Sequence, residues 1–496
     1  MVKDINADEW ELYDALAPLA EVEFLDIQKT SEIELPKKVK EWEKEVLTYS
    51  LFNEFPATLS YFCLLGQILK DFIRIPIGPF SLDPRVQVCW IQTSRTGKSA
   101  MFKFLEPVWS NTFELINNHP TTFNPPKPPL MGLKQFTLHA PDSFTDQALL
   151  GTMRMNVPNP EYNRREPDED IPEFIDIPIS GLLEGSGLIC FDEFEHSGLF
   201  KETQHKQETV MHFQKFMNSL DSPTHIIRKR LTEWGRDLVV DCQRSLWATT
   251  LPPEGLERVI LTKGVFQRML LYVREVPESL RMKMEEEYLD IFGEEKEVEY
   301  PIEKWSEDFY STYKWVEQRY IEVDGNSRKV ITFSETGKAK IKSEWRAMRK
   351  YMNNLREDIY EATNTFIMNT INNIGIIAVL CAVSERQTEV TDRHVRQAAK
   401  ITSASFTSII DWFETKLRKT PKRLIDRVKD ESIVKAYGIC KKNSDGWVLK
   451  AAMCSNWCKV SEGSRSGFYR KWPTMQYLFE EKIINSKKYI RRIKNG

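Results

Sequence analysis

Residues 90–102, WIQTSRTGKSAMF, constrain the fold of this chain more than any other stretch. An apolar run, Val86–Ile91, precedes the loop, and the residues from Ala100 to Leu105 can begin a helix. In a strand, loop and helix of this kind, the loop N–H groups and the helix N-terminus can surround a phosphate. The sequence therefore predicts an α/β fold whose phosphate-binding residues are Gln92, Thr93, Ser94, Arg95, Thr96, Gly97, Lys98, Ser99 and Ala100.

The first position of this loop departs from the usual pattern, because Gln92 stands where glycine is expected. A residue with a side chain in the turn geometry of glycine costs about 1–2 kcal/mol, which a folded domain can absorb. Gly97, where the backbone comes closest to phosphate, is retained. We expect a distorted but working loop in which Lys98 reaches the β- and γ-phosphates of ATP and the Ser99 hydroxyl binds Mg²⁺.

About ninety residues later, an apolar run, Gly187–Phe191, ends in Asp192-Glu193. Such a strand would place Asp192 beside the metal and let Glu193 orient and activate the attacking water. The alternative is that the two carboxylates only end a strand in a charged loop. Spacing and order favour a P-loop ATPase, with Asp192 added to the nucleotide- and metal-binding residues.

Two further segments supply candidate catalytic residues. The run Ser245–Thr250 is a third strand, and a polar side chain at its end, Thr249 or Thr250, could contact the γ-phosphate or the water. Arg268 precedes another apolar run. In a ring of ATPases an arginine there can reach the γ-phosphate of the neighbouring subunit, whereas without a ring Arg268 would be a surface ion-pair residue.

Composition fits a soluble protein of several domains: 41% of the 496 residues are hydrophobic and 28% are charged. The longest apolar stretch, Ile374–Val383, is far shorter than the ~20 residues that span a membrane, which favours a buried helix and no membrane partner. Eight scattered cysteines lack the spacing of a disulfide scaffold and fit a reducing compartment. The expected location is the cytoplasm, or the interior of a host cell.

Charge is unevenly distributed along the chain. Residues 416–496 hold 21 Lys or Arg and 7 Asp or Glu, a net charge of +14, so the preceding residues carry −17 of the overall −3. Helical patterns over 447–460 and 468–484 and a strand pattern over 487–493 predict a winged-helix domain that binds DNA. A solvated lysine-rich surface is the alternative, and the candidate phosphate contacts are Arg465, Arg470 and Lys471.

The order of these parts resembles that of minichromosome maintenance (MCM) helicases of the AAA+ class, and more closely the MCM-like helicases of phages and mobile elements. The resemblance covers 56–419 and includes the segment from Gly181 to Phe194, the Thr249-Thr250-Leu251-Pro252-Pro253 strand end and Gly264–Arg268. It implies a P-loop core over 56–280 with pore hairpin insertions and a helical lid over 281–419. The winged-helix domain predicted from the patterns of the basic segment would occupy 420–496. Residues 1–55 form an N-terminal helical region without a counterpart to the MCM DNA-binding domain. Asn369 stands where the family has its second sensing arginine, so either that arginine comes from elsewhere or hydrolysis is controlled differently.

The resemblance also implies a hairpin, formed by residues 224–242, that holds DNA in the central channel of a ring. Basic side chains there would contact phosphates without specifying sequence, and Trp234 could stack on a base or sugar. A solvated hairpin with a buried tryptophan is the alternative. The candidate DNA-binding residues are Arg228, Lys229, Arg230, Trp234 and Arg236.

We therefore expect an ATP-driven, ring-shaped DNA helicase or translocase that acts in replication as a homo-oligomer, most simply a hexamer. A primase or a polymerase is a candidate partner. An AAA+ replication initiator or helicase loader, and a non-enzymatic DNA-binding scaffold, are the alternatives. For the helicase or translocase, the expected catalytic residues are Lys98, Glu193, Thr249, Thr250 and Arg268.

Overall fold

The structure is a computed structural model. It describes residues 34–50, 53–93, 96–119, 136–141, 146–162, 172–197, 206–222, 224–231, 236–252, 264–274, 300–418, 435–443, 446–461, 465, 468–469, 472, 479–484 and 487–492, with isolated positions between 282 and 289.

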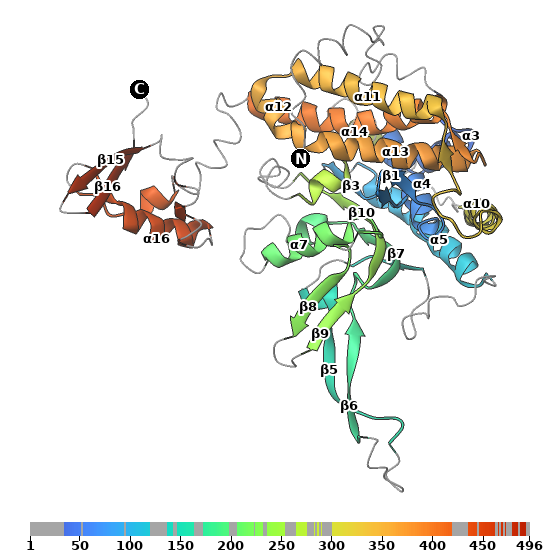
Figure 1. The fold of residues 1–496 in the computed structure, drawn as a ribbon, viewed down its shortest axis with the longest axis horizontal. Helices are drawn as coiled ribbons and strands as arrows, with labels where there is room; N and C mark the ends of the chain where they lie inside the picture. Colours follow the sequence, from blue (N-terminus) through green and yellow to red (C-terminus); the bar gives the residue numbers. More distant parts are fainter. Residues whose placement is uncertain are drawn as a thin grey trace.

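A five-stranded parallel sheet forms the centre of the α/β fold (Figure 1). Its order is β11 (Leu270–Arg274), β3 (Val88–Gln92), β10 (Cys242–Thr250), β7 (Gly185–Phe191) and β4 (Thr137–His139). The apolar residues of β3, β7 and β10 are buried, as expected for parallel strands covered on both faces. All five strands run the same way, so the loops that follow β3, β7 and β10 meet at one edge.

Two helices connect the sheet to its covering layers. α4 (Glu54–Ile68) is buried along almost its whole length and packs on β10, β7 and β3. α5 (Lys98–Asn117) begins directly after the predicted phosphate loop and buries Phe104, Trp109 and Phe113. Gln67 of α4 donates a hydrogen bond to the main-chain oxygen of Gln243 at 2.8 Å, which fixes α4 to the central strand.

Helices fill residues 302–418, the segment predicted to form a helical lid. They are α10 (Ile302–Glu322), α11 (Glu335–Asn353), α12 (Glu357–Thr363), α13 (Ile367–Ser384) and α14 (Asp392–Arg418), with two-residue strands β12 (Thr332–Phe333) and β13 (Glu389–Val390) and the short turn η3 (Asn364–Phe366). α11, α13 and α14 pack together as one layer (Figure 1). The Val273 amide donates to Ser408 Oγ at 3.2 Å, so α14 lies against the edge strand β11 and covers it.

The predicted buried helix is confirmed: Ile374–Val383 lies within α13 and is buried throughout. In the part of the chain that the structure describes, one helical run, Ile359–Ser384, is long and apolar enough to span a membrane, but 72% of its apolar window is buried. This is the behaviour of a core helix in a soluble protein. All eight cysteines are free thiols.

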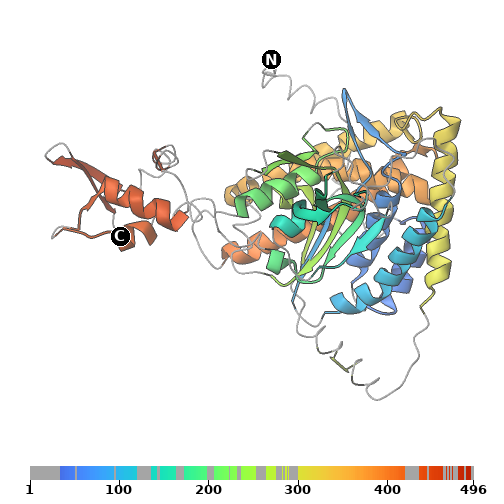
Figure 2. The ribbon, with the colours of Figure 1, turned by 90° about the horizontal axis from the view of Figure 1, so that it is seen from below.

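The helix that precedes the sheet belongs to the same hydrophobic core. α3 (Lys37–Leu47) presents Val39, Trp42 and Val46 on one buried face. The Trp42 indole N–H donates to the Ala57 carbonyl at 3.1 Å, and its ring contacts those of Trp305 and Phe309 in α10. Residues 37–50 are thereby fixed between α4 and α10, the long yellow helix at the right of Figure 2.

Three antiparallel hairpins extend from the core. They are β1–β2 (Ile75–Ile77 and Phe80–Leu82), β5–β6 (Gly151–Pro158 and Phe174–Ser180) and β8–β9 (Ile227–Leu231 and Arg236–Val240). The hairpin predicted over 224–242 is confirmed as β8–β9. β5–β6 and β8–β9 both project from the lower part of the body in Figure 1.

The basic C-terminal segment has a second, separate core made by residues such as Trp457, Phe468 and Trp472. It contains α16 (Lys450–Ser461) and a three-stranded antiparallel sheet, β14 (Val448–Leu449), β16 (Lys487–Arg492) and β15 (Phe479–Ile484). The predicted final strand is confirmed as β16. The prediction that the helical stretch continues to residue 484 is wrong, because 479–484 pair with β16 as a strand.

Candidate nucleotide site and Arg268 pocket

The first residue of the predicted phosphate loop belongs to the strand that precedes it. Gln92 lies in the last position of β3, is buried, and accepts a 2.6 Å hydrogen bond from the Trp90 indole on Oε1. Its backbone does not adopt a positive φ, so Gln92 carries none of the strain of a glycine-like turn. Gly97 has φ of 82°, at the N-cap of α5. Glycine is therefore needed at the second glycine position of the motif and not at the first.

Lys98 lies on the first turn of α5 with its ammonium folded back over the loop. Its Nζ donates to the main-chain oxygens of Gln92 at 2.7 Å and Thr93 at 2.9 Å. Burial lowers the pKa of Lys98, while the nearby Asp192 and Glu195 carboxylates act in the opposite direction. Thr93 Oγ1 is buried and has no hydrogen-bond partner among the described residues. A phosphate could take over both sets of interactions, because it offers acceptors to the lysine and to the hydroxyl.

Ser99 and Asp192 come together although 93 residues separate them. Ser99 Oγ donates to Asp192 Oδ2 at 3.1 Å. Thr249 Oγ1, buried at the end of β10, lies 2.9 Å from Asp192 Oδ1 and 2.6 Å from the Asp192 main-chain oxygen. β10 lies between β3 and β7 in the sheet, so the threonine reaches the acidic residue from the adjacent strand. Thr249 thus orients Asp192, with its own hydroxyl turned to that residue.

Lys98, Ser99 and Asp192 border one open pocket of about 250 Å³ at the carboxyl edge of the sheet. Glu193 is exposed there, directly after Asp192. Thr250 is buried and its hydroxyl contacts the Glu195 carboxylate. The pocket is lined by Thr96, Gly97, Lys98, Ser99, Ala100, Asp192, Glu193, Glu195 and Leu251. Two predicted loop residues, Ser94 and Arg95, lie outside the described residues.

Arg268 lies at the opposite edge of the sheet. It belongs to the short turn η2 (Phe266–Arg268) before β11, where Leu270 is paired with Val88 at the start of β3. The phosphate loop follows the other end of β3, roughly 13 Å further along at the usual rise of a strand. The nucleotide pocket and Arg268 are therefore on opposite sides of one subunit.

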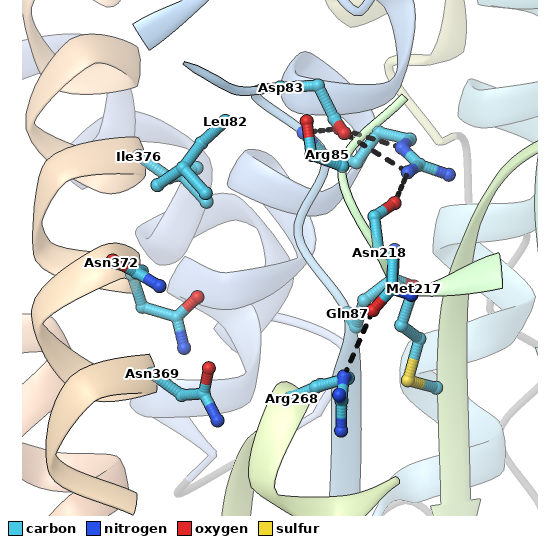
Figure 3. Close-up of a pocket in the computed structure, with 12 residues that line it drawn as sticks. Leu82, Asp83, Arg85, Gln87, Met217, Asn218, Arg268, Asn369, Asn372 and Ile376 are labelled. Atoms are coloured by element: carbon cyan, nitrogen blue, oxygen red, sulfur yellow. Dashed lines mark hydrogen bonds and ion pairs between the residues drawn. The ribbon is translucent and has the colours of Figure 1, made fainter. Parts of the chain in front are cut away.

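A second pocket, of about 230 Å³, surrounds Arg268 (Figure 3). The Arg268 guanidinium donates to the Gly264 carbonyl at 2.6 Å and to Asn218 Oδ1 at 3.3 Å, and burial lowers the pKa of Arg268. Asn369 and Asn372 of α13 face it from the other wall. Asn369 is thus close to Arg268 and belongs to this pocket, away from the subunit's own phosphate loop.

The predicted DNA-binding residues are described in part. Arg228 is exposed on β8, and Arg465 is exposed in the C-terminal segment. For Lys229, Arg230 and Arg236 the structure describes the strand backbone only, in which Arg230 pairs with Asp237 and Arg236 with Leu231. Trp234, Arg470 and Lys471 lie outside the described residues.

Sequence reasoning missed three side chains at the nucleotide pocket. Glu195 lines it, and Ser50 and Asn53 hydrogen-bond to the loop carbonyls of Gly97 and Thr96 at 2.9 and 2.7 Å. Glu195 lies two residues after Glu193, and this short spacing is a signal that could have identified it as a pocket residue. Ser50 and Asn53 lie more than 40 residues before the loop, in a segment with no recognisable motif.

No protein-family model matches the chain, and no curated protein matches it.

Proposed function

We propose that this protein is an AAA+ ATPase of the MCM-like type that uses ATP hydrolysis to move along DNA. One observation carries the proposal: Lys98, Ser99 and Asp192 converge with Glu193 at the carboxyl edge of a parallel sheet, the edge at which ligands bind in open α/β folds. The convergence supports the phosphate-loop interpretation over that of an unrelated Gly-Lys-Ser triplet.

The donor set fits Mg²⁺ held together with a triphosphate. Within the described part of the chain, no group of three or more His, Cys, Asp or Glu side chains could hold a metal ion. Magnesium in nucleotide sites needs only one or two protein ligands, because phosphate oxygens and water complete its shell. Ser99 and Asp192 would hold the ion, which neutralises charge on the β- and γ-phosphates when bound.

The remaining side chains have distinct tasks in hydrolysis. Lys98 would leave the Gln92 and Thr93 carbonyls and bind the β- and γ-phosphates. Glu193 is exposed to the pocket and would accept the proton of the attacking water, which it also orients. Thr249 would hold Asp192 in position through its hydroxyl.

The position of Arg268 supports a ring. An arginine at the edge of the sheet opposite the phosphate loop cannot reach the nucleotide of its own subunit, but it can complete the site of a neighbour. A closed ring repeats such a head-to-tail contact around one axis, and a hexamer is the assembly we propose. Charge developing on the transferred phosphoryl group would then be stabilised across the interface.

The basic elements supply the proposed contacts to DNA. The β8–β9 hairpin follows α7 (Lys206–Phe216) and leads directly into β10, the strand whose end holds Thr249. A change around the γ-phosphate could therefore move the hairpin through β10, which only Asp241 separates from β9. The C-terminal segment, with net charge +14 over 416–496, is proposed to be a winged-helix DNA-binding domain.

DNA-stimulated ATP hydrolysis tests this function. Wild type should hydrolyse ATP faster when DNA is present, Lys98→Ala should lose hydrolysis, and Glu193→Gln should bind ATP yet turn it over slowly. Normal hydrolysis by Lys98→Ala would refute the site. Displacement of one strand of a forked duplex separates a helicase from an initiator or loader, and absence of ATPase activity with DNA present would favour a non-enzymatic scaffold.

A further inference from the structure

Two side chains outside the sheet hold the phosphate loop from behind. Asn53 Nδ2 donates to the Thr96 carbonyl at 2.7 Å and to Ser50 Oγ at 3.1 Å, and Ser50 Oγ donates to the Gly97 carbonyl at 2.9 Å. Both are buried, with exposures of 3% and 1%. We refer to this pair as the Ser50–Asn53 clamp.

Asn53 binds the loop instead of capping its own helix. It occupies the N-cap position of α4, where an asparagine side chain usually accepts a hydrogen bond from the first turn of its own helix. The Asn53 side chain makes no such capping bond. An asparagine that leaves its own helix uncapped and binds a distant carbonyl group is typical of functional sites.

The orientation of the loop amides follows from the clamp. In a planar trans peptide the N–H points opposite to the C=O. A Thr96 carbonyl held by Asn53 therefore turns the Gly97 N–H away from the clamp, and a Gly97 carbonyl held by Ser50 does the same for the Lys98 N–H. Gly97 and Lys98 line the nucleotide pocket, so these are the amides that can meet a phosphate.

The clamp has a rigid support. Tyr49, next to Ser50, stacks on Phe104 of α5 with ring centroids 4.9 Å apart, and α3 is fixed to α10 by the Trp42 cluster and by an ion pair between Lys38 and Asp308. The positions of Ser50 and Asn53 are thus set by the core and not by the loop that they hold.

We propose that Ser50 and Asn53 are positioning residues for the phosphates of the nucleotide: they preorganise the Gly97 and Lys98 amides to bind a di- or triphosphate. The inference rests on the proposed nucleotide site. Because the hydrogen bonds are made to the loop and not to the ligand, their loss should weaken phosphate binding while the remainder of the fold stays intact.

Titration of each variant with Mg·ATP and Mg·ADP tests this role. Asn53→Asp keeps the side-chain shape but places an acceptor against the Thr96 carbonyl, and should weaken both nucleotides about tenfold. Ser50→Ala removes one hydroxyl and should weaken them about threefold. In hydrolysis, KM should rise more than kcat falls, and the rise in Tm caused by Mg·ATP should shrink.

Asn117→Ala is the matched control, since Asn117 exchanges two 2.9 Å hydrogen bonds with the backbone of Phe136 at the far end of α5. It should leave nucleotide affinity unchanged even where it lowers Tm. If wild type, Asn53→Asp and Ser50→Ala bind nucleotide with equal affinity, the role of the clamp is refuted and the proposed function still stands. The same holds if Asn117→Ala loses as much nucleotide affinity as the clamp variants. Should Asn53→Asp not fold, Ser50→Ala decides. Absence of any nucleotide binding by wild type would overturn the proposed function and the clamp with it.

Discussion

Replacing Gly97 by alanine should disable the phosphate loop by an amount that can be worked from its geometry. At φ of 82° a residue with a Cβ costs about 1–2 kcal/mol. The new Cβ would lie 2.8 Å from Ser50 Oγ and 3.2 Å from Asn53 Nδ2, so the clamp must shift as well. Loss of the hydrogen bond between Ser50 and Gly97 adds about 1 kcal/mol.

The variant can relieve this strain of about 2–3 kcal/mol by letting the free loop leave its native conformation. The competent loop would then be populated at roughly one part in 30 to 150, and the apparent Kd for Mg·ATP should rise by the same factor. Calorimetric titration measures that change. Gly375→Ala is the control: Gly375 lies in α13 with no atom within 4 Å of an added Cβ and should keep wild-type affinity. Wild-type affinity in Gly97→Ala would refute the reasoning.

Arg268→Ala should lower ATP hydrolysis about 10³-fold. Mixing it with Lys98→Ala should restore part of the activity, because a site formed between the two variants can combine an intact Lys98 with an intact Arg268. No recovery on mixing would count against a site shared between subunits. Thr249→Val should raise the Mg²⁺ concentration needed for half-maximal hydrolysis about tenfold by freeing Asp192, and an unchanged requirement would argue against that role. Burial opposes ionisation of Asp83, but Arg85 at 2.7 Å outweighs it and holds the pKa of Asp83 below its usual value. The pair therefore stabilises the fold above about pH 4 and loses this contribution as pH falls further. Asp83→Asn should cost about 3 kcal/mol at pH 7 and flatten the acid limb of urea unfolding curves; an unaltered pH dependence would contradict the sign.

Much of the sheet could be predicted because its strands are short apolar runs that end in polar loops. The runs that became β3, β7, β10 and β11 were all identified, and so was the contact between the Ser99 and Asp192 segments. The spatial order of the strands could not be predicted, because parallel pairing joins segments far apart in the chain, and no local pattern encodes which strand lies beside which.

Where prediction failed, a tertiary contact outweighed a local pattern. Residues 479–484, FEEKII, place apolar side chains at helical spacing, yet they pair with 487–492 across a hairpin. At Gln92 the motif implied a glycine-like turn, whereas the chain continues as a strand and the side chain is held by Trp90. The role of Ser50 and Asn53 could not be predicted from the sequence for a similar reason, because their hydrogen bonds to the loop span 47 and 43 residues.

The central claim is that one Mg·ATP binds between the Lys98 loop and the Asp192-Glu193 carboxylates. Equilibrium binding of labelled ATP in the presence of Mg²⁺, measured on wild type and Lys98→Ala side by side, tests it most directly. Wild type should show saturable binding at one site per chain, and the variant should show a large loss of affinity. Undiminished binding by Lys98→Ala, or no saturable binding by wild type, would contradict it.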